Sequence, residues 1–250
     1  MTDLTGKKAV VTGGSRGIGE ATAIALSKCG AEVLLTYRSR KEQAESVVGK
    51  IEAGGGKAQA RALDVTDPVA IKGFGDEVSQ TLGRVDVLFN NAGDLVKRRS
   101  IEEQTPEYIR EVLDLNVLST ILVTQALVPL MSKGGVIVNM SSAAGRDGGG
   151  PGASVYAAGK GAVLALTRGW TKEFAPRGIR VFAVAPGVID TDFHKRHSSP
   201  ELLESIAKNA PTAKCGVPDD VARAVVYLAG EGNGFMGGVT IDINGGQFCY

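Results

Sequence analysis

The chain has 250 residues, of which 43% are hydrophobic, and 28 Lys and Arg residues against 27 Asp and Glu residues give it a formal net charge of +1. This length and composition predict one α/β domain with one substantial core, without internal repeats or a domain linker. The balanced charge argues against a nucleic-acid partner, and no apolar stretch approaches the roughly 20 residues that span a bilayer. Because the N-terminus is also too polar for a signal peptide, we expect a soluble cytoplasmic protein that contacts no membrane.

The sequence offers little support for a metal site. Cys29, Cys215 and Cys249 are odd in number and far apart, which predicts free thiols in a reducing compartment rather than a disulfide framework or a zinc site. His194 and His197 lie three residues apart, but no acidic or cysteine partner accompanies them. We therefore expect that the protein binds no metal.

A glycine-rich turn follows the first predicted strand. The apolar strand over residues 7–12 leads directly into this turn, and helical periodicity continues over residues 18–29. Glycines can simply close a loop, but a strand, a glycine turn and a helix in this order favour nucleotide binding, because the helix N-terminus offers N–H groups to a pyrophosphate. The candidate contacts in this turn are Gly13, Ser15, Arg16, Gly17, Ile18 and Gly19.

The second predicted strand, residues 32–37, ends where an adenosine ribose is usually recognised. An acid at that position selects NAD through the 2′-hydroxyl, and an arginine selects NADP through the 2′-phosphate. The sequence has Tyr37 and Arg38 there and no acid, while Arg16 projects from the glycine turn. Arg38 and Arg40 could instead form a solvated loop, but the missing acid favours NADP(H) as the cofactor.

Asp64 and Val65 directly follow the third predicted strand, residues 57–62. The next helix is expected to be capped by Thr66 or Asp67. Asp64 then has two possible roles: it is a second cap or loop acid, or it accepts a hydrogen bond from the adenine amine. Both residues are candidate cofactor contacts.

The fourth predicted strand, residues 85–89, ends in a polar turn. Asparagine and glycine suit a turn, yet this one lies at the carboxyl end of a central strand, where parallel sheets bind their ligands. The candidate cofactor contacts in the turn are Asn91, Ala92 and Gly93.

A long apolar helix is expected over residues 106–131, with Asn116 as its polar interruption. A buried amide among apolar side chains must find hydrogen-bond partners. Asn116 either bonds the helix backbone or holds a water near an active site.

The stretch over residues 136–160 carries the strongest chemical signal. An apolar strand is followed by Ser141 and Ser142, and Tyr156 and Lys160 then lie four residues apart, on one face of a helix. Taken alone, such a pair is usually structural. A cation within about 4–6 Å lowers an acid's pKa by roughly 1–3 units, so we expect Lys160 to lower the pKa of Tyr156 and to favour proton exchange near neutral pH. Ser142 could donate a hydrogen bond to the same oxygen.

The C-terminal third completes the alternation of strands and helices. A sixth strand is expected over residues 179–185 and a last one over 239–243, with a polar, partly helical insertion over residues 191–214 between them. The alternation implies a parallel sheet with right-handed crossovers.

The motifs together resemble the short-chain dehydrogenase/reductase family. Each motif is weak by itself, but the ordered set covers the whole chain as far as Gly246: Thr12-Gly13-x-x-x-Gly17-Ile18-Gly19, Asp64-Val65, Asn90-Asn91-Ala92-Gly93, Asn116, Ser142, Tyr156-x-x-x-Lys160 and Pro186-Gly187-x-x-x-Thr191. The resemblance implies a single NADP-binding domain over residues 1–250, with a three-layer Rossmann fold, a doubly wound parallel sheet of about seven strands and a substrate lid near residues 191–214. It also implies a homotetramer.

The resemblance further implies roles for four catalytic residues. Tyr156 would donate the proton in carbonyl reduction, Lys160 would lower its pKa and hold the nicotinamide ribose, Ser142 would polarise the carbonyl, and Asn116 would anchor a proton-relay water. The hydride would come from the reduced cofactor. The additional cofactor contacts would be Pro186, Gly187, Ile189 and Thr191, the last of these on the nicotinamide amide.

The substrate stays open between two groups within the family. Arg16 and the ending over residues 237–246 resemble 3-oxoacyl-[acyl-carrier-protein] reductases, although residues 131–135 lack the richer basic cluster typical of them. Residues 148–153 and 190–194 are similar to reductases of the acidic keto sugar from alginate breakdown, of the 4-deoxy-5-hexoseulose uronate type. A sugar or polyol dehydrogenase is an alternative, and a non-catalytic NADP-binding redox sensor would not need all four catalytic residues.

Two further expectations concern the surface. The helices over residues 106–131 and 155–174 would each keep an uncovered apolar face, which favours a tetramer, or failing that a dimer. The basic clusters 97–99 and 194–197 follow two turns that border the expected nicotinamide position. They are either solvated loop charges or a field that attracts an anionic small-molecule substrate.

Overall fold

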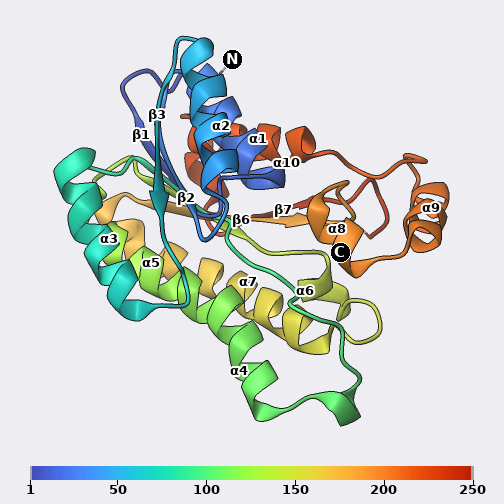
Figure 1. Ribbon diagram of the computed structural model, residues 1–250. Helices are drawn as coiled ribbons and strands as arrows, with labels where there is room; N and C mark the ends of the chain where they lie inside the picture. The colour runs from blue at the N-terminus through green and yellow to red at the C-terminus, as the bar shows by residue number, and fades with distance from the viewer. Residues whose placement is uncertain (1, 249–250) are drawn as a thin grey trace.

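The computed structural model describes residues 2–248, with the backbone alone at positions 200 and 202, so Cys249 lies outside the described residues. Over this range the chain forms one seven-stranded parallel sheet of order β3-β2-β1-β4-β5-β6-β7 (Figure 1). This confirms the expected α/β fold. The strands are β1 (Lys8–Val11), β2 (Glu32–Tyr37), β3 (Lys57–Ala62), β4 (Val87–Asn90), β5 (Val136–Met140), β6 (Arg180–Pro186) and β7 (Thr240–Ile243).

The central strands are apolar because helices cover both faces of the sheet. All of β5 is buried, and its paired register places Asn90 of β4 beside Asn139. The chain first builds the sheet outward from β1 to β3 and then returns to place β4 on the other side of β1. Such a reversal point leaves a crevice at the carboxyl ends of the strands, which is where open α/β sheets bind ligands.

Helices lie on both faces of the sheet (Figure 1). One face carries α1 (Gly17–Lys28), α2 (Lys41–Ala53) and α10 (Pro218–Ala229). The opposite face carries α3 (Pro68–Thr81), α4 (Pro106–Leu113), α5 (Ser119–Leu127) and α7 (Ser154–Phe174). The short helices α6 (Ala144–Asp147), α8 (Asp192–His197) and α9 (Pro200–Asn209) lie beyond the carboxyl ends of the strands, at the right of Figure 1.

The turn before α3 decides between Thr66 and Asp67 as the cap of that helix. The Asp67 carboxylate accepts hydrogen bonds from the N–H groups of Val69 and Ala70 and is the N-cap. The Asp64 carboxylate accepts from the N–H and the hydroxyl of Thr66, at 2.9 and 2.7 Å. Asp64 therefore helps to order this turn, and its contact with an adenine stays a prediction.

The expected continuous helix over residues 106–131 is wrong in detail. After α4 the chain makes a π-helical turn over Asp114–Leu118, continues as α5 and ends in a 3₁₀ turn over Val128–Leu130. The amide of Asn116 donates to the carbonyl of Val112 at 2.9 Å, the same acceptor that an α-helical N–H at position 116 would use. This competition accounts for the wider turn.

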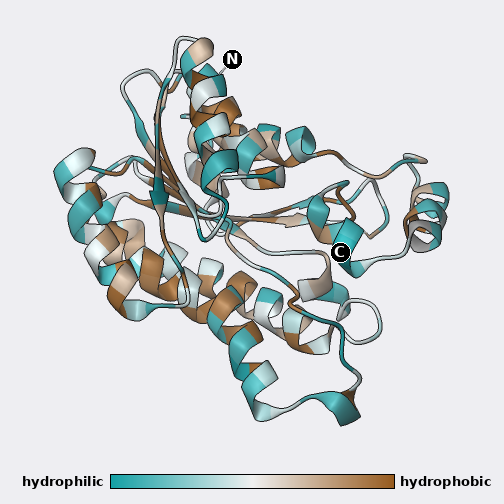
Figure 2. Ribbon diagram, in the orientation of Figure 1, coloured by the Kyte–Doolittle hydropathy of each residue, from teal (hydrophilic) through white to brown (hydrophobic). Residues whose placement is uncertain are grey.

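The expectation that no apolar stretch approaches the length of a membrane span is wrong for the same segment. Within the described part of the chain, Pro106–Leu130 is long and apolar enough to cross a membrane by length and composition, with a mean hydropathy of 1.5. One side of this segment packs against α3 and α7. Figure 2 shows apolar residues along α5, and 39% of the apolar window is buried within the chain.

Candidate active site

A cavity of about 980 Å³ opens over the carboxyl ends of the strands. Its walls bring together the glycine turn after β1, the ends of β2, β4, β5 and β6, the start of α7, and α8. Every site residue predicted from the sequence lines it except Asn116 and Asp64. Asp64 lies outside the wall although its neighbours Leu63 and Val65 are part of it, so the structure gives no support to Asp64 as an adenine contact.

The glycine turn is shaped so that the first N–H groups of α1 face the cavity. Gly13 and Gly17 have positive φ angles of 64° and 54°, and a Cβ on Gly19 would lie 2.3 Å from the carbonyl oxygen of Gly13. The N-cap residue, Arg16, makes no side-chain capping bond. A helix start of this kind leaves backbone donors for an anion, and a dinucleotide pyrophosphate fits it.

Asn91 holds this turn against the end of β4. Its side-chain amide donates to the carbonyl oxygens of Thr12 and Gly13, at 2.8 and 3.1 Å. The hydroxyl of Thr12 accepts in return from the N–H groups of Asn91 and Ala92. The predicted cofactor contact Asn91 therefore also has a structural task, which its position in a turn did not reveal.

A buried polar network supports the floor of the site and was missed in the sequence. The Asn90 amide donates to Asn139 and Thr124, each at 2.9 Å, and the Asn139 amide donates to Thr167 at 3.0 Å. These bonds join β4, β5, α5 and α7 beneath the cavity. A polar residue inside an otherwise apolar strand, as at position 139, is the signal that could have revealed it.

Tyr156 and Ser142 face each other in the cavity. Tyr156 lies in the first turn of α7, is 9% exposed, and is hydrogen-bonded to the Ser142 side chain. The hydroxyl of Ser141 instead donates to the carbonyl oxygen of Lys160 at 2.8 Å and is buried. The geometry therefore favours Ser142 over Ser141 as the serine beside the phenol.

Lys160 and Asn116 meet next to Gly93. The Lys160 ammonium lies 5.7 Å from the ring centre of Tyr156 and donates to the carbonyl oxygen of Met140 at 3.0 Å. A Cβ on Gly93 would stand 2.7 Å from Asn116 Oδ1 and 3.0 Å from Lys160 Nζ. Asn116 Oδ1 is buried and has no hydrogen-bond partner among the described residues. A buried acceptor beside an ammonium fits a bound water that links the two groups.

The arrangement of these groups matches a known family. A family model described as Enoyl-(Acyl carrier protein) reductase matches residues 13–247. The chain belongs to the short-chain dehydrogenase/reductase family. It is therefore an oxidoreductase that acts as a dehydrogenase or reductase.

Relatives and solved structures agree with this assignment. A 3-oxoacyl-[acyl-carrier-protein] reductase of Synechocystis is 37% identical, with all of both chains covered. A short-chain dehydrogenase of Burkholderia cenocepacia in complex with NADP superposes with a TM-score of 0.91 at 37% identity, covering 97% of this chain and 98% of that one. An NADH-dependent reductase, A1-R′, responsible for alginate metabolism, has a TM-score of 0.90 at 32% identity, covering 99% of each chain.

The electrostatics of this dehydrogenase/reductase site overturn one expectation. Burial is the largest cause that raises the pKa of Tyr156 to about 12; the hydrogen bond to Ser142 acts in the opposite direction, and the charge of Asp94 acts in the same direction as burial. Burial also lowers the pKa of Lys160 to about 8. The prediction that Lys160 brings the pKa of Tyr156 toward neutrality is wrong in this structure, because desolvation of the buried phenol is the largest cause of its shift. The phenol is thus protonated at neutral pH.

A cationic group surrounds the outer end of the cavity. Arg16, Tyr37, Arg38 and Arg40 line this end. Burial lowers the pKa of Arg16, and the charges of Arg40 and Arg196 lower it further. The Arg16 guanidinium also lies 3.3 Å from a carboxylate oxygen of Asp192 in α8. A phosphate placed among these arginines would relieve their mutual repulsion.

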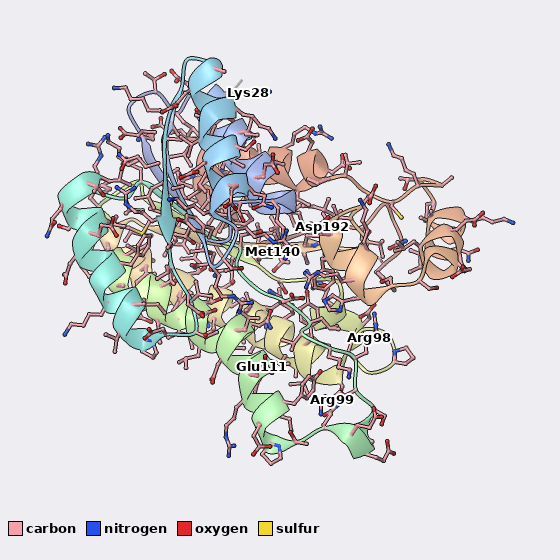
Figure 3. All side chains as sticks on the ribbon, in the orientation of Figure 1. Lys28, Arg98, Arg99, Glu111, Met140 and Asp192 are labelled. Atoms are coloured by element: carbon pink, nitrogen blue, oxygen red, sulfur yellow. The ribbon has the colours of Figure 1, made fainter. Side chains whose placement is uncertain are left out.

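The basic clusters over residues 97–99 and 194–197 converge at the cavity, but much of their charge is compensated. Arg98 donates to the carbonyl oxygens of Pro151 and His197, at 2.7 and 2.9 Å. Arg196 pairs with Asp94, an acid that the sequence analysis did not single out. Burial lowers the pKa of His194 to about 4, so this ring is neutral at pH 7. Figure 3 shows Arg98 beside the loop that leads into α7, with Arg99 directed away toward α4.

Proposed function

We propose that this short-chain dehydrogenase/reductase reduces a carbonyl group to an alcohol with NADP(H). One observation carries the proposal: a protonated, buried phenol, the hydroxyl of Ser142 and the ammonium of Lys160 converge at the inner end of a cavity whose outer end is a glycine turn. When bound, the reduced nicotinamide supplies a hydride to the carbonyl carbon. The proton for the carbonyl oxygen must then come from the protein.

Each catalytic residue has a task that follows from its position. Tyr156 donates its phenolic proton to the substrate oxygen, and Ser142, in contact with the phenol, donates a hydrogen bond to the same oxygen. Lys160 stabilises the resulting phenolate because its ammonium lies beside the ring. The unpartnered Asn116 Oδ1 accepts from a water near Lys160, through which the proton of Tyr156 is restored.

The residues of the outer end would hold NADP(H). The glycine turn would hold the pyrophosphate, while Arg16 and Arg38 would bind the 2′-phosphate at the end of β2, where an acid is missing. The NADP complex of the Burkholderia enzyme supports this choice, whereas A1-R′ uses NADH, so the preference rests on the arginines. Further contacts would come from Ser15, Tyr37, Val65, Asn91, Ala92, Gly93, Pro186, Gly187, Ile189 and Thr191.

The substrate in this proposal is a 3-oxoacyl thioester or an acidic keto sugar. The curated reductases favour the first and A1-R′ favours the second. Arg98 and Arg196 line the cavity and would attract an anion, although Asp94 compensates part of that field. A sugar or polyol substrate is the alternative within the family. The same proposal includes a cytoplasmic location, a single domain over residues 1–250 with a lid near residues 191–214, and a homotetramer.

A substrate panel tests the proposal. NADPH oxidation would be followed with 3-oxoacyl esters, acidic keto sugars, aldoses and simple ketones, and a keto acid would be compared with its ester at low and high salt. An anion-binding site predicts about a tenfold preference for the acid, which shrinks as salt screens the charges.

The control is Tyr156→Phe, which keeps the ring but removes the proton and should lower kcat at least about 10²-fold. NADPH binding without turnover of any member would favour the redox sensor.

A further inference from the structure

Helix α8 forms a wall above the proton donor. The ring of Phe193 in α8 lies 5.9 Å from the ring of Tyr156. The rings of His194 and His197 pack edge-on against Phe193, at 5.1 and 4.9 Å. Because these contacts join α8 to the reacting residue, the position of α8 sets the space left for a substrate above the phenol.

A single carboxylate, that of Asp94, receives both basic residues at the end of α8. Asp94 Oδ2 lies 2.8 Å from Arg196 Nη1, and Asp94 Oδ1 lies 2.8 Å from His197 Nε2, which must carry a proton to donate to it. The Asp94 side chain is 22% exposed and that of His197 is 7% exposed. Burial alone would raise the pKa of Asp94, but the two hydrogen bonds outweigh it and hold the pKa below its usual range. The Asp94 carboxylate is therefore ionised at neutral pH.

The backbone of Asp94 contacts the catalytic residues. Its carbonyl oxygen accepts from the side-chain amide of Asn116 at 2.7 Å, which directs the amide oxygen of Asn116 toward Lys160. Asp94 thus connects α8 with the residue proposed to hold the relay water. Exposed ion pairs contribute little to stability, but here one largely buried carboxylate accepts two bonds from the same short helix, and charge-assisted bonds of this kind are stronger.

We propose that Asp94 is a positioning residue of the reductase. Its carboxylate latches α8 over Tyr156, and its backbone carbonyl orients Asn116. Arg98, which donates to the carbonyl oxygen of His197, is a second tie between the same loop and α8. The catalytic part of this proposal rests on the proposed function, whereas the latch itself can be measured without turnover.

Hydrogen exchange of the amides over residues 192–198 tests the latch directly. Asp94→Asn keeps the size of the side chain but replaces one carboxylate oxygen with an amide that cannot accept. The exchange of these amides should become about tenfold faster or more, the scale of one charge-assisted bond. Asp86→Asn is the matched control. Asp86 directly precedes β4, the strand that Asp94 follows, and its side chain is 17% exposed. Like Asp94, it accepts two hydrogen bonds, here from the Arg84 side chain and from a backbone N–H. The control should leave exchange over 192–198 unchanged.

Steady-state kinetics test the positioning role. If the variant populates an open α8, the KM for the carbonyl substrate should rise by about tenfold, because only the closed fraction binds well, while kcat in the saturated complex changes much less. Arg196→Gln removes the partner in α8 and should act in the same direction. The double variant should raise KM no more than the single variant with the larger effect, because both substitutions break the same contact between Asp94 and Arg196.

The outcomes separate the two proposals. Unchanged exchange over residues 192–198 in Asp94→Asn overturns the latch, and if that variant does not fold, the same measurement on Arg196→Gln decides it. Faster exchange with kcat lowered and KM unchanged overturns the positioning role assigned here. A wild-type protein that turns over no carbonyl overturns the proposed function, yet its exchange pattern still decides whether Asp94 holds α8.

Discussion

At the scale of single residues, the burial of Tyr156 determines how the reaction depends on pH. A pKa raised to about 12 keeps the phenol protonated, the form that carbonyl reduction needs. Alcohol oxidation needs the phenolate. At any pH below the pKa, the fraction of phenolate grows about tenfold when the pH rises by one unit. We expect the reduction kcat to be flat between about pH 6 and 7 and to fall as the Lys160 ammonium loses its proton near its pKa of about 8, while the oxidation rate rises with pH up to that point. An oxidation rate that levels off near pH 7 would instead mean that Lys160 lowers the pKa in the reacting complex.

The arginines at the outer end of the cavity carry the cofactor prediction. Charge-assisted bonds to a 2′-phosphate are worth about 1.5–3 kcal/mol each, so Arg38→Ala or Arg16→Ala should weaken NADPH binding by roughly 10- to 100-fold. NADH lacks that phosphate and should be affected less. Titration of both cofactors by fluorescence checks this, with Arg110→Ala as a control, because Arg110 is exposed and pairs only with Glu107 nearby. Equal losses for NADPH and NADH would refute the phosphate contact.

At the scale of elements, the buried amide network fixes β4 and β5 against the helices behind them. Asn139→Val removes one acceptor of the Asn90 amide and the donor to Thr167, so each of these buried groups loses one of its two hydrogen bonds. We expect a loss of about 1–3 kcal/mol in the free energy of unfolding, measured by urea denaturation. Gln80→Ala, at an exposed position of α3, should change it by less than about 0.5 kcal/mol. A variant at position 139 as stable as this control would show that the network contributes nothing.

At the scale of the whole molecule, the segment Pro106–Leu130, which includes α4 and α5, keeps apolar residues that the described part of the chain leaves only partly covered. Only 39% of the apolar window in Pro106–Leu130 is buried, and Leu118 in its middle is 39% exposed. We predict that a second copy of the chain covers this face in an assembly with closed symmetry. We expect a tetramer in light scattering at micromolar concentration. A monomer under those conditions would show that the face stays open to water.

The resemblance to the family singled out Ser142 and Asn116 as candidate catalytic residues, while the amino-acid sequence by itself predicted the parallel α/β fold, the glycine turn before α1, and the pair formed by Tyr156 and Lys160. These features follow from local patterns: apolar runs, a strand–glycine–helix order, and residues spaced along one helix face. They need no knowledge of which distant segments meet.

Only the tertiary structure decided the remaining properties of the site. The pKa of Tyr156 depends on how completely neighbouring segments exclude water, and the orientation of the Asn116 amide depends on a carbonyl contributed by Asp94. The latch likewise pairs positions 94 and 196, which are 102 residues apart. Desolvation and long-range hydrogen bonds arise between segments that no local pattern places together, so the sequence specifies the reactive groups and the fold sets their charge and orientation.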